Sequence, residues 1–222
     1  LTNPGEWVPQ AIDALRNNRT NLTRSNADPL FDNAFQSLGA NGAAIYAEMR
    51  RHIFHAEGNQ GLELVNIKGT SGEIGLRIHG ADRYFGLINI GDDANFLTQA
   101  EKKLEAIPQG EDQFANSLFD DINRSDSSIN ILLGAKKFVE GWDSWRVSTM
   151  GLLNIGRGEG PEIIQLFGRG LRLLGWNRAL KRSSEIANLP IATPPGLTTL
   201  ERLNIFGVRA NYMAQFRDYL EQ

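Results

Sequence analysis

The chain has 222 residues, of which 41% are hydrophobic and 22% charged, an ordinary globular composition that suits one decorated domain or two small ones. It contains no cysteine, which excludes disulfides and thiolate metal sites and fits a reducing cytoplasm. No apolar run approaches the roughly 20 residues needed to cross a bilayer, so we expect no membrane partner and a cytoplasmic protein.

Charge is distributed unevenly along the chain. The formal net charge of −3 argues against general binding of polyanions. Residues 157–182, however, carry six basic and two acidic side chains, whereas the rest of the chain carries 17 basic and 24 acidic ones. A local positive patch on an acidic body indicates a defined phosphate site.

Residues 1–58 are predicted to be helical, with an interruption at "NNRTNLTRSNADP". The strongest helical pattern runs over 42–56, where Ile45, Met49 and Ile53 recur at four-residue spacing. The first residues, "LTNPGEWVPQ", contain neither an initiator Met nor a signal-peptide pattern, so we expect a segment of a longer protein.

The middle of the chain changes to strand patterns. Residues 62–67 and 73–79 predict a β-hairpin around "KGTSG", and 84–92 predicts a strand buried on both faces. Two helices are then expected, over 95–106 and 111–122.

Further buried strands are predicted at 129–135 and 147–156, a loop over 183–199, a strand at 201–208 and a closing helix at 211–222. Between them the Gly-rich turn "GRGEGPE" leads into a helix. Strands that alternate with helices predict an α/β fold with a mainly parallel sheet.

The helix after this Gly-rich turn, "EIIQLFGRGLRLLGW" at residues 162–176, has a narrow polar stripe. Gln165, Arg169 and Arg172 fall within about 60° of one another on a helix, and Phe167 falls on the opposite side. A polar face turned to water is the simpler interpretation of such a stripe, and a ligand site is the other.

This helix and the segment before it resemble a known family. "GAKKFVEGWDSWRVSTMGLLNIG" followed by "IIQLFGRGLR" looks like motifs V and VI of superfamily 2 helicases, particularly the Res-subunit-like helicases of type III restriction enzymes and their DEAD/DEAH relatives. The motif VI pattern Q-x-x-G-R-x-x-R matches at Gln165, Gly168, Arg169 and Arg172. Motif V matches at Glu140, Gly141 and Asp143, and "YFGLINIGD" is loosely similar to motif IV.

The resemblance, which covers residues 84–175, implies a RecA-like fold of the P-loop NTPase type, with helices on both faces of the sheet. Residues 59–222 would form the second RecA-like domain of an ATP-dependent helicase or translocase, and 1–58 a helical accessory region. ATP with Mg²⁺ would be held mainly by the first RecA-like domain of the same parent chain. The further partners implied are double-stranded DNA and a modification methyltransferase subunit, in the cytoplasm of a prokaryote.

The resemblance also implies a role for each motif residue. Arg172 would be the arginine finger, Arg169 a second contact to the γ-phosphate, and Gln165 would orient the nucleotide or the attacking water. Gly168 would let the backbone pass close to its neighbours.

In motif V, Glu140, Gly141 and Asp143 would lie at the nucleotide, and a plain capped turn is the alternative interpretation of this segment. Lys136 and Lys137 would contact the nucleic-acid backbone, or else lie in water.

Other patterns in the sequence restrict the function. No G-x-x-x-x-G-K-[ST] loop and no DExx box occurs, so we expect no ATP hydrolysis by these residues alone. Glu48, His52 and His55 share a helical face, but without an HExxH pattern we expect no metal there. The alternatives are a degenerate motor-like module that binds DNA or protein without ATP, and a metabolic α/β enzyme with its own nucleotide pocket.

Overall fold

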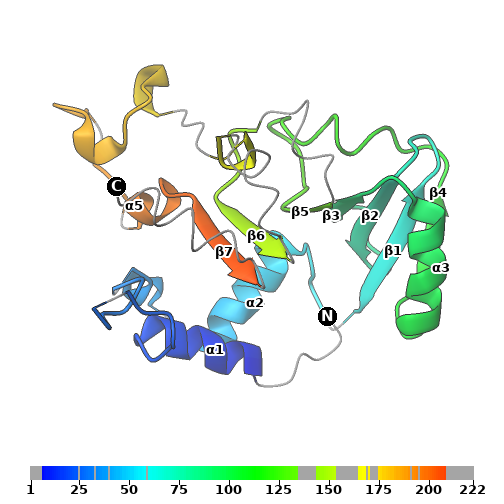
Figure 1. Cartoon of the computed structure of the whole chain (residues 1–222), viewed down its shortest axis with the longest axis horizontal. Coiled ribbons are helices and arrows are strands. Elements are labelled where there is room, and N and C mark those ends of the chain that lie inside the picture. Colours follow the sequence, from blue (N-terminus) through cyan, green and yellow to red (C-terminus); the bar gives the residue numbers. More distant parts are fainter. Residues whose placement is uncertain are drawn as a thin grey trace. The chain divides into compact units, whose positions relative to one another are not determined.

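The computed structural model describes residues 7–24, 26–32, 34–39, 41–58, 60–134, 144–153, 165–168, 170, 175–190, 192–194 and 196–208. The chain divides into two compact units, Leu1–Lys137 and Phe138–Gln222. The predicted helical region lies in the first unit together with a five-stranded sheet (Figure 1).

The first unit begins with two helices that pack together, α1 (Trp7–Arg16) and α2 (Gly42–Ile53). The α2 helix begins at the residue predicted for it and ends before the predicted Ala56. Asn41 caps its start by accepting a hydrogen bond from the Ala44 amide at 2.9 Å.

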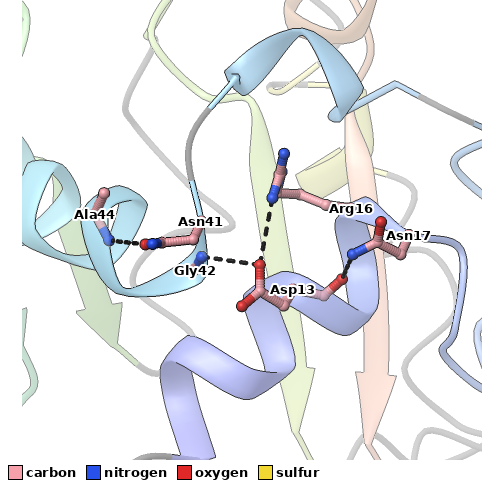
Figure 2. A network of polar contacts seen from close by, with 6 residues as sticks. All are labelled: Asp13, Arg16, Asn17, Asn41, Gly42 and Ala44. Atoms are coloured by element: carbon pink, nitrogen blue, oxygen red, sulfur yellow. Dashed lines mark hydrogen bonds and ion pairs between the residues drawn. The ribbon is translucent and has the colours of Figure 1, made fainter.

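An unusual contact joins the two helices, because Asp13 of α1 reaches the first turn of α2 (Figure 2). Its Oδ1 accepts hydrogen bonds from the Gly42 amide at 2.8 Å and from Arg16 Nη1 at 3.3 Å. A Cβ at Gly42 would collide with the Pro9 carbonyl oxygen. Glycine here therefore lets α1 approach closely enough for a carboxylate to satisfy an unpaired amide at the start of α2.

The sheet of the first unit has the order β4-β1-β2-β3-β5. Its strands are β1 (Leu62–Ile67), β2 (Glu73–Ile78), β3 (Tyr84–Asn89), β4 (Gln109–Asp112) and β5 (Ile131–Gly134). β2 pairs antiparallel with both β1 and β3, while β4 pairs parallel with β1 and β5 parallel with β3. Four strands therefore point the same way, and the predicted hairpin and mostly parallel α/β sheet are confirmed.

One hydrophobic cluster in the core of this unit lies on one face of the sheet. Helix α3 (Asp93–Lys103) covers that face with Phe96, Leu97 and Ala100, and the chain after α2 adds Phe54 and Ala56 (Figure 1). The sheet contributes buried side chains from its three central strands: Leu64, Ile74, Leu76, Ile78, Phe85 and Ile88. Every residue of β3 is buried, as its continuous apolar sequence predicted.

The opposite face is covered differently from the prediction, since the helix expected over 111–122 is wrong. Residues 109–112 form β4, and turns follow it within 113–126. The Asp112 carboxylate accepts the amides of Phe114 and Ala115, and Glu73 accepts the amide of Leu118. Because these side chains take the amides that a helix would use, the segment is held as turns.

The second unit contains a parallel pair of strands, β6 (Thr149–Leu153) and β7 (Asn204–Val208), which lie side by side in Figure 1. A helical turn at 165–168 packs Phe167 against Met150 and Leu152. The predicted loop over 183–199 contains two short turns of helix, η4 (Ser183–Glu185) and α5 (Leu197–Leu200); a further turn, η3 (Trp176–Arg178), precedes it. The helix predicted at 211–222 lies outside the described residues.

Two strands predicted to be buried are less so. In β6 burial alternates, with Met150 and Leu152 buried and their neighbours exposed, so one face alone is covered. In β5 the side chain of Leu133 is 48% exposed, in agreement with its place at the edge of the five-stranded sheet. Continuous apolar runs thus located these strands but overstated how many faces are covered.

We predict that Gly75→Ala destabilises the first unit, because a Cβ there would lie 2.5 Å from two ring carbons of Tyr84. Moving the ring should cost about 1–3 kcal/mol in the free energy of unfolding, measured with urea. Gly91→Ala is the control, since a Cβ at Gly91 meets no described atom within 4 Å. Equal stability of the two variants would contradict the proposed packing.

Candidate functional site

Most of the predicted site residues lie outside the described part of the chain. This holds for Lys136, Lys137, Glu140, Gly141, Asp143, Arg169 and Arg172. Gln165 and Gly168, both in the helical turn 165–168, are described. The structure therefore describes the first half of the predicted motif VI, residues 165–168.

The helical turn shows how the polar stripe begins. Phe167 is 3% exposed and packs under β6, with Leu166 and Leu203 beside it, whereas Gln165 is exposed. This is the arrangement that the helical periodicity predicted for these two residues. Gln165, the first residue of the polar stripe, therefore lies on the side of the helical turn that faces away from the core cluster of the second unit.

The two glycines of this segment have different surroundings. We expected Gly168 to let the backbone pass close to its neighbours, but a Cβ there would meet no described atom within 4 Å. The close approach occurs at Gly170, where a Cβ would lie 2.7 Å from Met150 Cε and 2.8 Å from Leu203 Cδ2. Packing thus explains glycine at 170 and leaves glycine at 168 without a steric reason in the described structure.

In the first unit, the carboxyl ends of β1, β3, β4 and β5 share one edge of the sheet. Ligands of open α/β sheets bind at this kind of edge. The segment "NIGDD", residues 89–93, contains the end of β3 and the chain that follows it at this edge. Asp92 in this segment caps α3 by accepting the Asn95 amide at 3.0 Å, so its carboxylate already serves the helix.

Asn89, the last residue of β3, is the unusual polar group at this edge. It is fully buried, and neither its Nδ2 nor its Oδ1 has a hydrogen-bond partner among the described residues. Its neighbour in the sheet register, Glu73, is 1% exposed and accepts hydrogen bonds from Ser117 Oγ at 2.7 Å and the Leu118 amide at 2.8 Å. Burial of an amide side chain without hydrogen-bond partners lowers the stability of the fold, so Asn89 is an unusual residue to find at the end of a buried strand.

A second polar cluster crosses the same face of the sheet. Arg77 donates from Nε and Nη2 to the two carboxylate oxygens of Glu63, at 2.9 and 3.3 Å. The Tyr84 hydroxyl donates to Asp112 Oδ2 at 2.8 Å, and the Arg77 guanidinium lies 5.7 Å from the centre of the Tyr84 ring. Bidentate and charge-assisted contacts of this kind hold four elements in a fixed geometry.

The pKa shifts of Arg77, Tyr84 and Asp112 each favour one protonation state. Burial and then the hydrogen bond to Asp112 raise the pKa of Tyr84 far above its ordinary value. The Phe114 amide and then the Tyr84 hydroxyl lower the pKa of Asp112. The hydrogen bond to Glu63 raises the pKa of Arg77. Tyr84 therefore stays neutral and Asp112 ionised near neutral pH, which suits a structural cluster and not proton transfer.

Sequence reasoning did not single out this cluster, although part of it was open to prediction. A hairpin around residues 68–72 places Glu63 directly opposite Arg77, and opposite charges in such a pair attract. The contact between Tyr84 and Asp112 had no local signal, because residues 111–122 were predicted as a helix.

Glu48 and His52 of α2, and His55 just after it, contact other described residues. Glu48 contacts Arg51 at 2.9 Å and His52 at 3.1 Å, while His55 Nε2 lies 2.9 Å from the Ser128 carbonyl oxygen. In the part of the chain that the structure describes, no group of three or more His, Cys, Asp or Glu side chains could hold a metal ion. No helix within those same residues is long and apolar enough to cross a membrane.

No family model, curated protein or solved structure matches the chain at a significant level.

We predict a pH-dependent effect of Asp112→Asn on stability. Because the pKa of Asp112 is lowered from 3.8 in the folded chain, its ionised form stabilises the fold fully above that value. This contribution is lost as the pH falls through the folded-state pKa. The variant should be less stable than the parent near pH 7, and the difference should shrink as the pH falls below 3.8, as measured by urea unfolding.

The matched control is Asp120→Asn, which removes an exposed carboxylate from the same segment. It should change stability little at either pH. If Asp112→Asn shows the same difference from the parent at both pH values, ionisation of Asp112 does not support the turn at 112–115.

Proposed function

We propose that this chain contains the second RecA-like motor domain of an ATP-dependent DNA helicase or translocase, of the kind found in type III restriction–modification or related defence systems. The observation that carries the proposal is the Q-x-x-G-R-x-x-R pattern of Gln165, Gly168, Arg169 and Arg172, preceded by the motif V pattern. The mixed α/β architecture is compatible with this fold without being specific to it.

The geometry of the helical turn at 165–168 supports the proposal in one respect. A residue that acts on a nucleotide from a buried helix must lie on the side away from the core. Gln165 is exposed while Phe167, two residues on, is buried in the second unit. Under the proposal, Arg169 and Arg172 continue the stripe that Gln165 begins, at four- and seven-residue spacing.

The chemistry assigned to these residues is electrostatic. Phosphoryl transfer spreads negative charge over the γ-phosphoryl oxygens, and a guanidinium stabilises that charge through two parallel hydrogen bonds. In the proposal Arg172 supplies this contact as the arginine finger, Arg169 adds a second γ-phosphate contact, and Gln165 orients the nucleotide or the attacking water. Gly168, where a Cβ would meet no described atom within 4 Å, would leave room at the same surface.

Motif V completes the half-site in the proposal. Glu140, Gly141 and Asp143 would contact the nucleotide and transmit its state to the DNA-binding surface, and Lys136 and Lys137 would bind the DNA backbone as point charges. Mg²⁺ and the phosphate-binding loop would come from the first RecA-like domain, since the 222 residues contain no Walker loop. A methyltransferase subunit is the further partner that this assignment implies.

We predict that the chain by itself does not hydrolyse ATP. The residues that could position Mg·ATP are absent from the sequence, so a half-site should bind nucleotide weakly and turn none over. A phosphate-release assay with and without Mg²⁺ measures turnover, and calorimetry measures nucleotide affinity. Metal-dependent hydrolysis would contradict the proposal, and tight nucleotide binding by the chain alone would favour the metabolic-enzyme alternative.

We predict that Arg172→Ala, made in the protein with its first RecA-like domain present, lowers ATP turnover by about 10³–10⁵. The substitution removes the charge that stabilises the transferring phosphoryl group, so kcat should fall more than the affinity for ATP. Turnover is measured at saturating ATP and DNA.

Arg182→Ala is the matched control, because Arg182 lies in the same basic stretch and is exposed. It should leave kcat within a small factor of the parent value. If Arg172→Ala leaves both ATP turnover and DNA-dependent function intact, the degenerate binding module is the better interpretation.

A further inference from the structure

Asn41 and Gly42 form the one Asn-Gly sequence in the chain. This pair combines two groups that can react with each other, because the amide nitrogen of Gly42 can attack the side-chain carbonyl carbon of Asn41 and close a five-membered ring. Glycine has no Cβ to hinder that approach, and its backbone is the least restricted of all residues. The sequence therefore gives the pair the chemistry for deamidation without an enzyme.

The structure holds both of the groups that would react (Figure 2). The Gly42 amide, which would supply the attacking nitrogen, donates to Asp13 Oδ1 of α1 at 2.8 Å. The side-chain oxygen of Asn41 accepts from the Ala44 amide at 2.9 Å and caps α2. The nitrogen that would attack is therefore held by α1, and the carbonyl that it would attack is held in the cap of α2.

Ring closure is incompatible with the contact between α1 and α2. The nitrogen of the cyclic imide carries no hydrogen, so Gly42 could no longer donate to Asp13, which would keep its contact with Arg16 at 3.3 Å. Gly42 is also buried, and a Cβ there would collide with the Pro9 carbonyl oxygen. A charge-assisted hydrogen bond and close packing thus oppose the reaction while the two helices are in contact.

The reaction becomes possible when the two helices separate. No residue of α1 is fully buried, and an element with few buried contacts opens at a lower free energy than the whole fold. Asn41 is exposed, so ammonia can leave and water can reach the ring. The rate of reaction should therefore follow the fraction of chains in which α1 has moved away from Gly42.

We propose that Asn41 is a deamidation site which the contact between α1 and α2 protects. In the open state the Gly42 nitrogen loses its proton to solvent and bonds to Asn41 Cγ, the Cγ–Nδ2 bond breaks, and Nδ2 leaves as ammonia. Water then opens the imide at either carbonyl and gives an aspartyl or an isoaspartyl residue. The inference rests on these two helices and does not depend on the proposed motor function.

Either product would make the separation of the helices harder to reverse. Both products add a negative charge next to the residue whose amide contacts the Asp13 carboxylate, and like charges repel. In the isoaspartyl product the chain runs through the former side chain. The oxygen atoms that accept the Ala44 and Ile45 amides then exchange roles between side chain and backbone, which disturbs the start of α2. Deamidation would thus convert a transient opening into a lasting one.

The full chain tests the proposal when it is incubated near neutral pH and the mass gain of the peptide containing Asn41 is followed. Asp13→Ala removes the acceptor for the Gly42 amide, so the rate at Asn41 should rise about tenfold over the parent. Asp13→Asn keeps an oxygen acceptor and should stay closer to the parent. Glu57→Gln is the matched control, because it removes an exposed carboxylate after α2 and should leave the rate unchanged.

An unchanged rate at Asn41 in Asp13→Ala would overturn the proposal. Asn116, which is exposed and precedes Ser117 in the turns after β4, is the internal reference for general unfolding. A rise confined to Asn41 supports local opening of the helices. An equal rise at Asn41 and Asn116 would show that the substitution unfolds the chain generally, and the proposed protection by Asp13 would be wrong.

The unsubstituted chain provides a second test that needs no variant. Its rate at Asn41 should be about tenfold or more higher in urea than in the folded state, because unfolding removes the contact with α1. The rate in both states should rise with pH, since the attacking nitrogen must lose a proton. Equal rates in the folded and unfolded chain would overturn the proposal, because no contact would then protect the site.

Discussion

The first unit depends on the position of one tyrosine ring. Tyr84 begins β3, its ring lies where a Cβ on Gly75 of β2 would be, and its hydroxyl donates to Asp112 at the end of β4. Asp112 in turn fixes the turn that follows through the amides of Phe114 and Ala115. A single side chain thus links three strands and the turn that leaves β4, so the absence of a side chain at residue 75 is a condition for the whole arrangement.

The periodic parts of this fold were predictable from the sequence, and the parts fixed by long-range contacts were not. The start of α2 at Gly42, the hairpin of β1 and β2, and the buried β3 follow from spacing, turn residues and continuous apolar runs. The segment 111–122 was mispredicted because its amides are taken by Asp112 and Glu73, and a local pattern contains no information on such partners.

For the candidate site, the sequence predicted which side of the helix each motif VI residue occupies, and the structure describes the first of these residues. The exposure of Gln165 and the burial of Phe167 agree with the predicted stripe. The role given to Gly168 stays a prediction, and among the described residues the glycine that must be small for packing is Gly170, against Met150 and Leu203. Periodicity indicates which side of a helix a residue occupies, but the distance to a neighbouring element is a tertiary property that spacing alone does not supply.

The contrast between these two glycines bears on function. Glycine inside a helix costs roughly 1 kcal/mol relative to alanine, so it requires a compensating reason. Gly170 has one, because any larger residue would displace Leu203 or Met150. At Gly168 the described structure provides none, and that residue lies between Gln165 and the two arginines of the same motif. Under the proposed motor function, a bound partner outside the described residues accounts for glycine at this position. A phosphate group approached by Arg169 and Arg172 would supply the missing reason for glycine at 168.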